Sequence, residues 1–344
     1  MATPPAATRP TPERIFNTLN AYQHTAALRA AIELDIFTAI AEGANDAAAI
    51  AKKTRASERG VRILCDYLTI LGFLTKEKAN DKYSYGLPQD SRIFLDRHSP
   101  AYMGISINFL SNDTLLSNFS HLAEVVKKGG SVTGRGDNEK PNDEMWVAFA
   151  RSMGALSAPT AAFIAELTGM PQGKSCQILD VAAGHGMYGI TMGRQNPNAK
   201  ITAADWPKVL EVAQEHAREA GLADRYQTRP GSAFETDLGT GYDFVLLTNI
   251  FHHFDPPTCE KLMKRAHAAL RPGGQAVTLE FVTAEDRVSP PTAAMFSMVM
   301  LATTDAGDAY TFSEYEKMFS NAGFAKTTMH PVPGMPQQVL ISRK

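Results

Sequence analysis

The chain has 344 residues and a formal net charge of −2, with 34 Lys and Arg against 36 Asp and Glu. At roughly 150 residues per domain, this length predicts about two domains. A hydrophobic content of 44% and a charged content of 20% are typical of a soluble globular protein. The near-balance of charge gives no general attraction for nucleic acid or for an anionic membrane, so a basic nucleic-acid-binding protein is disfavoured.

The cysteines and the apolar segments indicate the compartment. Cys65, Cys176 and Cys259 lie far apart and predict neither a disulfide framework nor a zinc site, so we expect three reduced and buried thiols. The first residues, MATPPAATRPTPER, lack the apolar run of a secretory signal. The longest apolar stretch, around 293–302, is shorter than the ~20 residues of a membrane span. We therefore predict a cytoplasmic protein.

The N-terminal part of the chain predicts a small helical domain. After a Pro/Ala/Thr-rich tail, apolar residues recur at helical spacing from Ile15 to Ala30, and the run AIELDIFTAIAEG ends on a glycine suited to a helix C-cap. The runs DAAAIAKKT and SERGVRILCDYLTILGFL predict two further amphipathic helices, the second capped by Ser57. FLTKEKANDKYSYGL contains two β-like segments around a polar turn. Helices followed by a β-wing are typical of a winged helix-turn-helix, a fold that often binds DNA.

The periodicity changes in the second half of the chain. A helical pattern from about 100 to 167 is interrupted at KKGGSVTGRGDNEKP. Beyond it, the apolar runs QILDVAAG, AKITAADW, YDFVLLTNI and QAVTLEFV alternate with helical stretches. Strands that alternate with helices predict a parallel sheet in a doubly wound, Rossmann-like α/β domain. We place the helical domain at residues 1–108 and the α/β domain at residues 109–344.

A glycine-rich turn follows the first strand of this domain. In the run ILDVAAGHGMYG, Gly184 and Gly186 allow the backbone to approach a ligand, and the last glycine allows close packing of the next helix. Asp205 ends the second strand 25 positions after Asp180, close to the ~20-residue spacing expected of an acid that binds ribose hydroxyls. Together these features predict a site for an adenosine-containing cofactor.

The position of Asp180, four residues before Gly184, gives the pattern D-x-x-x-G-x-G. This pattern resembles motif I of the S-adenosylmethionine-dependent methyltransferases, in which the turn accommodates an amino-acid-bearing sulfonium. The segments 231–234, 243–249 and 270–274 resemble the later motifs of the family in the same order. The resemblance implies S-adenosylmethionine as the cofactor. It implies cofactor contacts from the following residues: Asp180, Gly184, Gly186, Asp205, Trp206, Ser232, Ala233, Phe234 and Asn249.

The segment NIFHHFD resembles the small-molecule O-methyltransferases of plant phenolic and bacterial polyketide pathways. That family has an N-terminal winged-helix dimerisation domain, so the resemblance covers nearly the whole chain and implies a homodimer. It also implies methyl transfer to a hydroxyl of a small aromatic molecule, without a metal and without a nucleic-acid or membrane partner. His252 matches the general base of the family, and Glu280 matches the acid that flanks this base.

The expected acceptor site draws on another helix. FARSM resembles the helix whose methionine lines the pocket for substrate and methyl donor, which implies substrate contacts from Met153 and Phe149. His253, beside the expected base, is also assigned to substrate binding.

Two positions depart from the family pattern. Ser232 stands where many relatives carry an aspartate, which predicts different hydrogen bonding to adenine. Where plant enzymes carry a second acid beside the base, this chain has Ala309, with Asp305 and Asp308 as neighbouring substitutes.

Two other classes of function stay open at this point. One is a pocket enzyme that uses the bound sulfonium as a structural or electrostatic element without transferring its methyl group. The other is a DNA-binding regulator that senses S-adenosylmethionine through its second domain. The wing KEKANDK mixes charges of both signs, and the helix 57–74 carries only Arg59 and Arg62, which is a poor footprint for phosphates. Both features disfavour the regulator.

Overall fold

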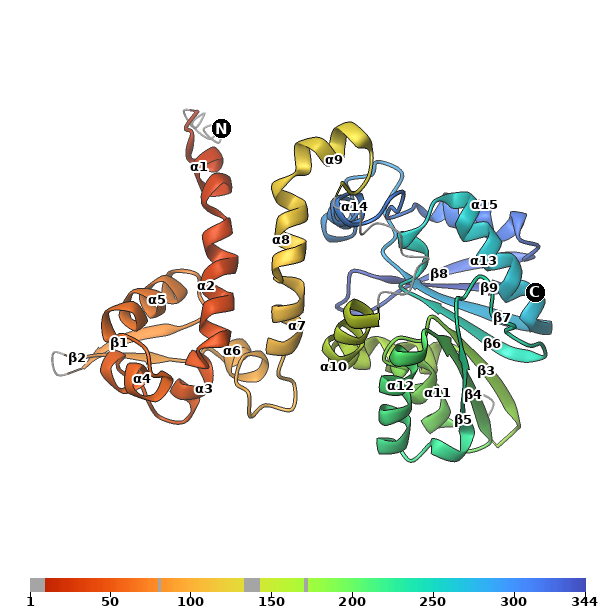
Figure 1. Ribbon diagram of the computed structural model, residues 1–344, viewed down its shortest axis with the longest axis horizontal. Helices are drawn as coiled ribbons and strands as arrows, with labels where there is room; N and C mark the ends of the chain where they lie inside the picture. The colour runs from red at the N-terminus through yellow and green to blue at the C-terminus, as the bar shows by residue number, and fades with distance from the viewer. Residues whose placement is uncertain (1–9, 80–81, 133–142, 170–172) are drawn as a thin grey trace, which may run out of the picture. The chain divides into compact units, whose positions relative to one another are not determined.

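The computed structural model describes residues 10–79, 82–132, 143–169 and 173–344. The chain divides into two compact units, Met1–Asn112 and Asp113–Lys344 (Figure 1). The domain boundary expected between residues 108 and 109 stays a prediction. Within the described ranges no single helix is long and apolar enough to cross a membrane, and one pair of helical halves, Glu144–Gly154 and Leu156–Leu167, meets the length and composition only when taken together across a 72° bend.

The first unit consists of helices and one antiparallel β-hairpin. Its helices are α1 Glu13–Asn20, α2 Tyr22–Glu33, α3 Ile36–Ala41, α4 Ala47–Thr54, α5 Glu58–Ile70, α6 Gln89–Phe94 and α7 Gly104–Leu110. Strands β1 Thr75–Ala79 and β2 Lys82–Gly86 pair to form the wing. Asp46 and Ser57 cap α4 and α5 by accepting the amides of Ala49 and Gly60, so the predicted helix starts are found where capping chemistry places them.

The second unit is an α/β domain built on a seven-stranded sheet of order β5-β4-β3-β6-β7-β9-β8 (Figure 1). The strands are β3 Cys176–Val181, β4 Ala199–Asp205, β5 Tyr226–Pro230, β6 Tyr242–Thr248, β7 Leu270–Glu280, β8 Lys326–Pro331 and β9 Gln338–Arg343. The helices are α8 Asp113–Ser120, α9 Leu122–Lys128, α10 Asp143–Leu167, α11 Met187–Gln195, α12 Pro207–Glu219, α13 Pro256–Ala269, α14 Pro291–Thr303 and α15 Phe312–Asn321, with short 3₁₀ turns at η1 Ala223–Arg225 and η2 Phe251–His253.

The doubly wound architecture expected from the sequence is confirmed, with one addition. Strands β3 to β7 run parallel to one another, whereas β9 pairs antiparallel with β7 and β8 pairs antiparallel with β9. The connection between β8 and β9 spans only residues 332–337, which is too short for the crossover that parallel strands require. The sequence patterns did not identify this terminal hairpin or β5.

Alternating side chains of the parallel strands form two apolar layers. Ile178 and Leu246 belong to the layer that α10, α11 and α12 complete, while Leu179 and Val245 belong to the layer that α13 and α15 complete. The strand order reverses between β3 and β6, and open α/β sheets bind ligands at the carboxyl ends of the strands at such a reversal. The sheet therefore sets the segments after β3 and β6 side by side.

Helix α10 is bent within its apolar length. Pro159 lies inside the helix, and its two halves meet at 72° around residue 155. A proline has no amide hydrogen for the carbonyl four residues earlier, and its ring crowds that carbonyl. The bend therefore falls where the chemistry of Pro159 predicts it.

Candidate active site

The turn after β3 contains two glycines that meet different requirements. Gly184 and Gly186 have φ angles of +56° and +72°, which L side chains rarely adopt. A Cβ on Gly186 would lie 2.6 Å from the Tyr226 hydroxyl and 3.0 Å from the Ala213 methyl, so this position is filled by the protein itself. A Cβ on Gly184 would meet only the Ala182 carbonyl, at 4.0 Å. The turn is thus closed at Gly186 and open at Gly184.

Asp180 lies behind this turn and is fully buried. Its Oδ2 accepts the Gly189 amide hydrogen at 3.1 Å, and its Oδ1 has no partner among the residues that the structure describes. Burial raises the pKa of its carboxyl to about 8, with the carboxyl of Asp205 adding to the shift and the bond from Gly189 opposing it. Asp180 therefore braces the start of α11, and its expected contact with the cofactor stays a prediction.

Asp205 lies at the carboxyl end of β4 beside the same turn. Its Oδ2 accepts the Gly184 amide at 2.8 Å, and its Oδ1 accepts the Trp206 amide at 2.6 Å. Burial raises the pKa of this carboxyl to about 6, against the lowering effect of the two amides. Each oxygen keeps a second lone pair, so the carboxylate can still accept two hydroxyl donors.

The segment 231–236 is attached to Asp205 and to α13. The Gly231 amide donates to the Asp205 carbonyl at 2.9 Å, which extends the pairing of β4 and β5 into this loop. The Arg265 guanidinium donates from Nε to the Ala233 carbonyl at 2.9 Å and from Nη2 to the Thr236 carbonyl. Arg265 was missed in the sequence analysis, because a contact between positions about 30 residues apart leaves no local signal.

The residues predicted to contact adenine lie within the segment 231–236, which these bonds fix in place. The Ser232 hydroxyl accepts the Phe234 amide at 3.2 Å. The Phe234 ring is buried and meets Phe254 edge-on at 5.1 Å, so it anchors the loop against the turn that carries the expected base.

His252 and Glu280 form a buried pair at the ends of β6 and β7. His252 Nδ1 lies 2.6 Å from Glu280 Oε2, and Glu280 Oε1 accepts the amides of Ile250 and Phe251 at 2.9 and 2.7 Å. A carboxylate can only accept, so Nδ1 carries the imidazole proton and Nε2 presents a lone pair. The two residues predicted to act together in the site are thus brought together by the sheet.

Aromatic rings surround the His252 imidazole. Phe296 of α14 meets it edge-on at 4.9 Å, and His253 lies at 4.3 Å. Phe281, directly after β7, stacks on Phe296 with a centroid distance of 3.9 Å. Neither phenylalanine was identified from the sequence, since an apolar aromatic residue in a helix or after a strand is indistinguishable from core there.

Helix α10 contacts the turn after β6, which carries His252 and His253. Trp146 contacts the His253 ring edge-on at 5.4 Å and the Phe149 ring at 6.0 Å. Trp146 and Trp206 also pack on one small apolar cluster. Phe149 and Met153 are both half-buried on this helix. Their expected contacts with the acceptor stay predictions.

The acids near Ala309 lie in ion pairs of their own. Asp305 Oδ1 is 3.8 Å from Lys128 Nζ, and Asp308 Oδ2 is 3.2 Å from Arg287 Nη1. Ala309 itself is fully buried. Of the acids in the described part of the chain, Glu280 is therefore the one whose carboxylate is bonded to His252.

Asn249 follows β6 with a left-handed backbone, φ +54°. Its Nδ2 donates to the Tyr188 hydroxyl at 3.3 Å, and its buried Oδ1 has no partner within the described ranges. A left-handed conformation is unusual for a residue other than glycine and occurs with asparagine more than with most. The side chain thus presents an unused acceptor at the reversal of the strand order.

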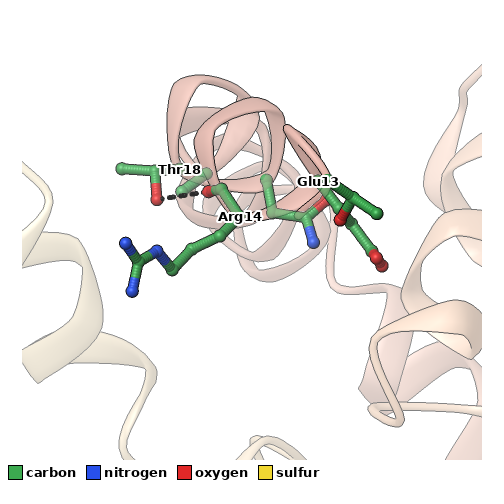
Figure 2. A pocket seen from close by; sticks show the side chains of 6 residues that line it. Glu13, Arg14 and Thr18 are labelled. Carbon is green, nitrogen blue, oxygen red and sulfur yellow. Dashed lines mark hydrogen bonds between the residues drawn. The ribbon is translucent and has the colours of Figure 1, made fainter. Parts of the chain in front are cut away.

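An open hollow lies along α1 of the first unit. Figure 2 shows Glu13, Arg14 and Thr18 around it, with the Thr18 hydroxyl bonded to the Arg14 carbonyl at 2.9 Å. Such a bond to the preceding turn is ordinary for a helical threonine. The hollow contains none of the expected catalytic residues.

Comparison with known proteins gives a consistent result for both units. The family model described as an O-methyltransferase domain matches residues 119–325, and the model of the O-methyltransferase dimerisation domain matches residues 16–97. The chain is 28% identical over 342 residues to the tetracenomycin polyketide synthesis 8-O-methyltransferase of Streptomyces glaucescens, with 97% of each chain covered.

Solved structures show the same similarity. A candidate O-methyltransferase from Nostoc punctiforme is 46% identical, with a TM-score of 0.92 over 98% of this chain and 100% of that one. Human N-acetylserotonin methyltransferase, solved in complex with S-adenosylmethionine, has a TM-score of 0.84 and 22% identity over 99% of both chains, which is a likeness of fold.

Proposed function

The chain belongs to the O-methyltransferase family and is dependent on S-adenosylmethionine, and from this premise we propose that it methylates a hydroxyl of a small aromatic molecule with His252 as the general base. The observation that carries the proposal is the buried contact of 2.6 Å between His252 Nδ1 and Glu280 Oε2, next to aromatic rings that pack against the imidazole.

The residues around the turn after β3 fit the cofactor. Asp205 has two lone pairs for the ribose hydroxyls, the turn is open at Gly184, and Asn249 Oδ1 offers an unused acceptor for an ammonium group. The loop of Ser232 to Phe234 lies next to Asp205 and is suited to adenine. When bound, S-adenosylmethionine supplies a methyl group on a positively charged sulfur.

The remaining task of the protein is to orient the acceptor and to take one proton from it. Glu280 fixes the proton of His252 on Nδ1, so Nε2 can accept the hydroxyl proton. The imidazolium that forms is stabilised by the adjacent carboxylate, which three hydrogen bonds hold in place. Such a base typically contributes ~10²–10⁴-fold, and positioning contributes about 7–11 kcal/mol where the geometry is good.

The rings near His252 support an aromatic acceptor. Phe281 and Phe296 form a stacked pair, and Trp146 and His253 meet edge-on nearby. Planar ligands bind well between such faces and edges because aromatic pairs favour these geometries. The names of the relatives, a polyketide O-methyltransferase and an N-acetylserotonin methyltransferase, agree with a hydroxylated ring system.

A panel of hydroxylated aromatic compounds tests this proposal. The purified protein is incubated with S-adenosylmethionine and each compound, and both S-adenosylhomocysteine and the methyl ether are measured by mass spectrometry. We expect both products with at least one compound, in equal amounts. A protein that binds the cofactor but methylates no hydroxyl in a broad panel would contradict transfer and favour an enzyme that uses the sulfonium without transferring its methyl group.

We further propose that the first unit, with its dimerisation domain, joins two copies of the chain. Helix α1 has no buried residue, and Ile15 and Leu19 are 62% and 65% exposed on it, together with Phe16; Tyr22, at the start of α2, is exposed as well. An apolar helix face of this kind is unfavourable in water and suits a two-fold contact with a second copy.

A further inference from the structure

We propose that His185 is a positioning residue that couples the cofactor turn to helix α10. The inference rests on the proposed function, because it takes the turn after β3 as the place where the cofactor binds. His185 lies between the two glycines of this turn, and its side chain is buried. The mechanism above gives it no part in proton transfer.

The hydrogen bonds of His185 have a defined direction. Its Nδ1 accepts the Met187 amide at 3.1 Å, so this nitrogen carries no proton. The proton of the neutral ring is then on Nε2, which donates to the Ser157 hydroxyl at 2.7 Å. The Ser157 hydroxyl donates in turn to the Met153 carbonyl at 3.0 Å. One ring thus connects the first turn of α11 with the middle of α10.

The surroundings keep this ring neutral and fixed. Burial lowers the pKa of His185 to about 4, and the neighbouring His216 adds to the effect. His216 Nδ1 also bonds the His185 carbonyl at 2.9 Å. A Cβ on Gly154 would lie 3.7 Å from the His185 Cβ, so the backbone of α10 passes directly against the turn.

The contact on α10 lies close to the residues expected to bind the acceptor. Ser157 lies just beyond the bend of the helix, and Met153 and Phe149, the expected acceptor residues, lie before it. A cofactor that orders the turn would therefore also order the half of α10 that faces the acceptor. The alternative is that His185 only caps α11, whose N-cap residue Gly186 has no side chain to do so.

The two roles can be separated by substitution. In His185→Asn, the shorter amide oxygen can still accept the amide two residues on, as asparagine does in turns, but the side chain no longer reaches Ser157. Ser157→Ala removes the link from the α10 side and keeps His185 itself; it also removes the contact of Ser157 with Tyr188 of α11, which His185→Asn retains. Thr168→Ala is the matched control, since the Thr168 hydroxyl, one residue beyond the end of α10, bonds carbonyls of that helix, those of Ile164 and Ala165.

Hydrogen exchange of the full-length protein, with and without S-adenosylhomocysteine, tests the coupling. In the wild type and in Thr168→Ala we expect the ligand to slow exchange of the α10 amides by at least about threefold. In His185→Asn and in Ser157→Ala we expect calorimetry to show affinity within about threefold of the wild type. We expect the slowing in α10 to be lost in both variants.

Undiminished protection of α10 in Ser157→Ala would overturn the coupling, even if His185→Asn failed to fold. A wild-type protein that binds no S-adenosylhomocysteine would be a different result, because it would overturn the proposed cofactor site and, with it, the inference.

Discussion

Glu280 and His252 share one short contact in the interior of the second unit, 2.6 Å between Oε2 and Nδ1, and the two residues are 0% and 4% exposed. The carboxylate comes from the end of β7 and the imidazole from the turn after β6. Adjacent parallel strands therefore place an orienting acid beside a candidate base.

The first prediction concerns the base. His252→Ala is expected to lower kcat by at least ~10²-fold because it removes the proposed proton acceptor. The affinity for S-adenosylhomocysteine should change little. Initial rates on the accepted aromatic compound, together with calorimetry, measure the two effects.

His253→Ala provides the matched control for His252. Its ring lies 4.3 Å from His252 but meets Trp146 rather than the orienting acid. We expect a much smaller loss of turnover. Near-wild-type turnover in His252→Ala would mean that the acceptor arrives ionised or that another group takes the proton.

A second prediction concerns the proton on the imidazole. In Glu280→Gln the amide NH₂ can face His252 and donate to Nδ1, which places the ring proton on Nε2, the wrong nitrogen for a base. We expect kcat to fall by ~10²-fold or more, with the thermal midpoint lowered because the charged acceptor of the Ile250 and Phe251 amides is lost. Full activity in a folded variant would show that Glu280 does not set the tautomer.

The two glycines of the turn give a third prediction. Gly186→Ala should destabilise the protein by about 1–3 kcal/mol or more, since a methyl group would clash with Tyr226 and Ala213. Gly184→Ala should cost about 1–2 kcal/mol through its left-handed backbone and should mainly weaken binding of S-adenosylhomocysteine. Denaturant unfolding and calorimetry measure both quantities. If both variants lost ligand affinity in the same proportion to their loss of unfolding free energy, the assignment of Gly184 to the open side and Gly186 to the closed side of the turn would be contradicted.

The strands that carry the site were predictable because their signals are local. The strands before Gly184 and Asn249 and the one ending at Asp205 are apolar runs bounded by polar or glycine residues, and that pattern reports burial on both faces of a sheet. The antiparallel end of the sheet was not found, because strand direction depends on the length of the connection rather than on composition.

The polar and aromatic residues that pack around the site could not be predicted from sequence patterns. Arg265 bonds carbonyls 29 and 32 positions away, and Phe296 meets His252 from a helix that the spacing does not relate to β6. Likewise, the sequence left Asp305 and Asp308 as possible neighbours of the base, whereas the structure places each beside a cation. Such partners are set by tertiary packing, which single-chain periodicity does not encode.

A fourth prediction concerns assembly. Light scattering at micromolar concentration should give twice the mass of the chain. The double substitution Ile15→Asp with Leu19→Asp should lower the measured mass toward that of one chain, because two carboxylates would be buried in the proposed contact. Val288→Asp, at an apolar side chain of the second unit that is 66% exposed, is the control and should leave the mass unchanged. A wild-type protein that is monomeric under these conditions would contradict the contact.

The last prediction joins Asp205 to pH. In the absence of ligand, burial raises the pKa of its carboxyl to about 6, whereas ribose hydroxyls donate to the ionised form and favour it. Binding should therefore be pH-independent well above 6 and should weaken as pH falls through 6, by up to about tenfold per pH unit, with release of a proton on binding near pH 6. Calorimetry of S-adenosylhomocysteine in buffers of different ionisation enthalpy measures the affinity and the proton together.

Two substitutions isolate the contribution of Asp205. Asp205→Ala should weaken S-adenosylhomocysteine at least about tenfold at pH 8, since it removes charge-assisted bonds worth roughly 1.5–3 kcal/mol each. Asp205→Asn keeps the shape but cannot ionise, so the change of affinity between pH 5 and 7 should flatten relative to the wild type. Because the carboxyl of Asp205 helps to raise the pKa of Asp180 to about 8, the comparison is confined to pH 5–7, below that value. An unchanged slope in Asp205→Asn would place the titrating group elsewhere and remove Asp205 from the ribose site.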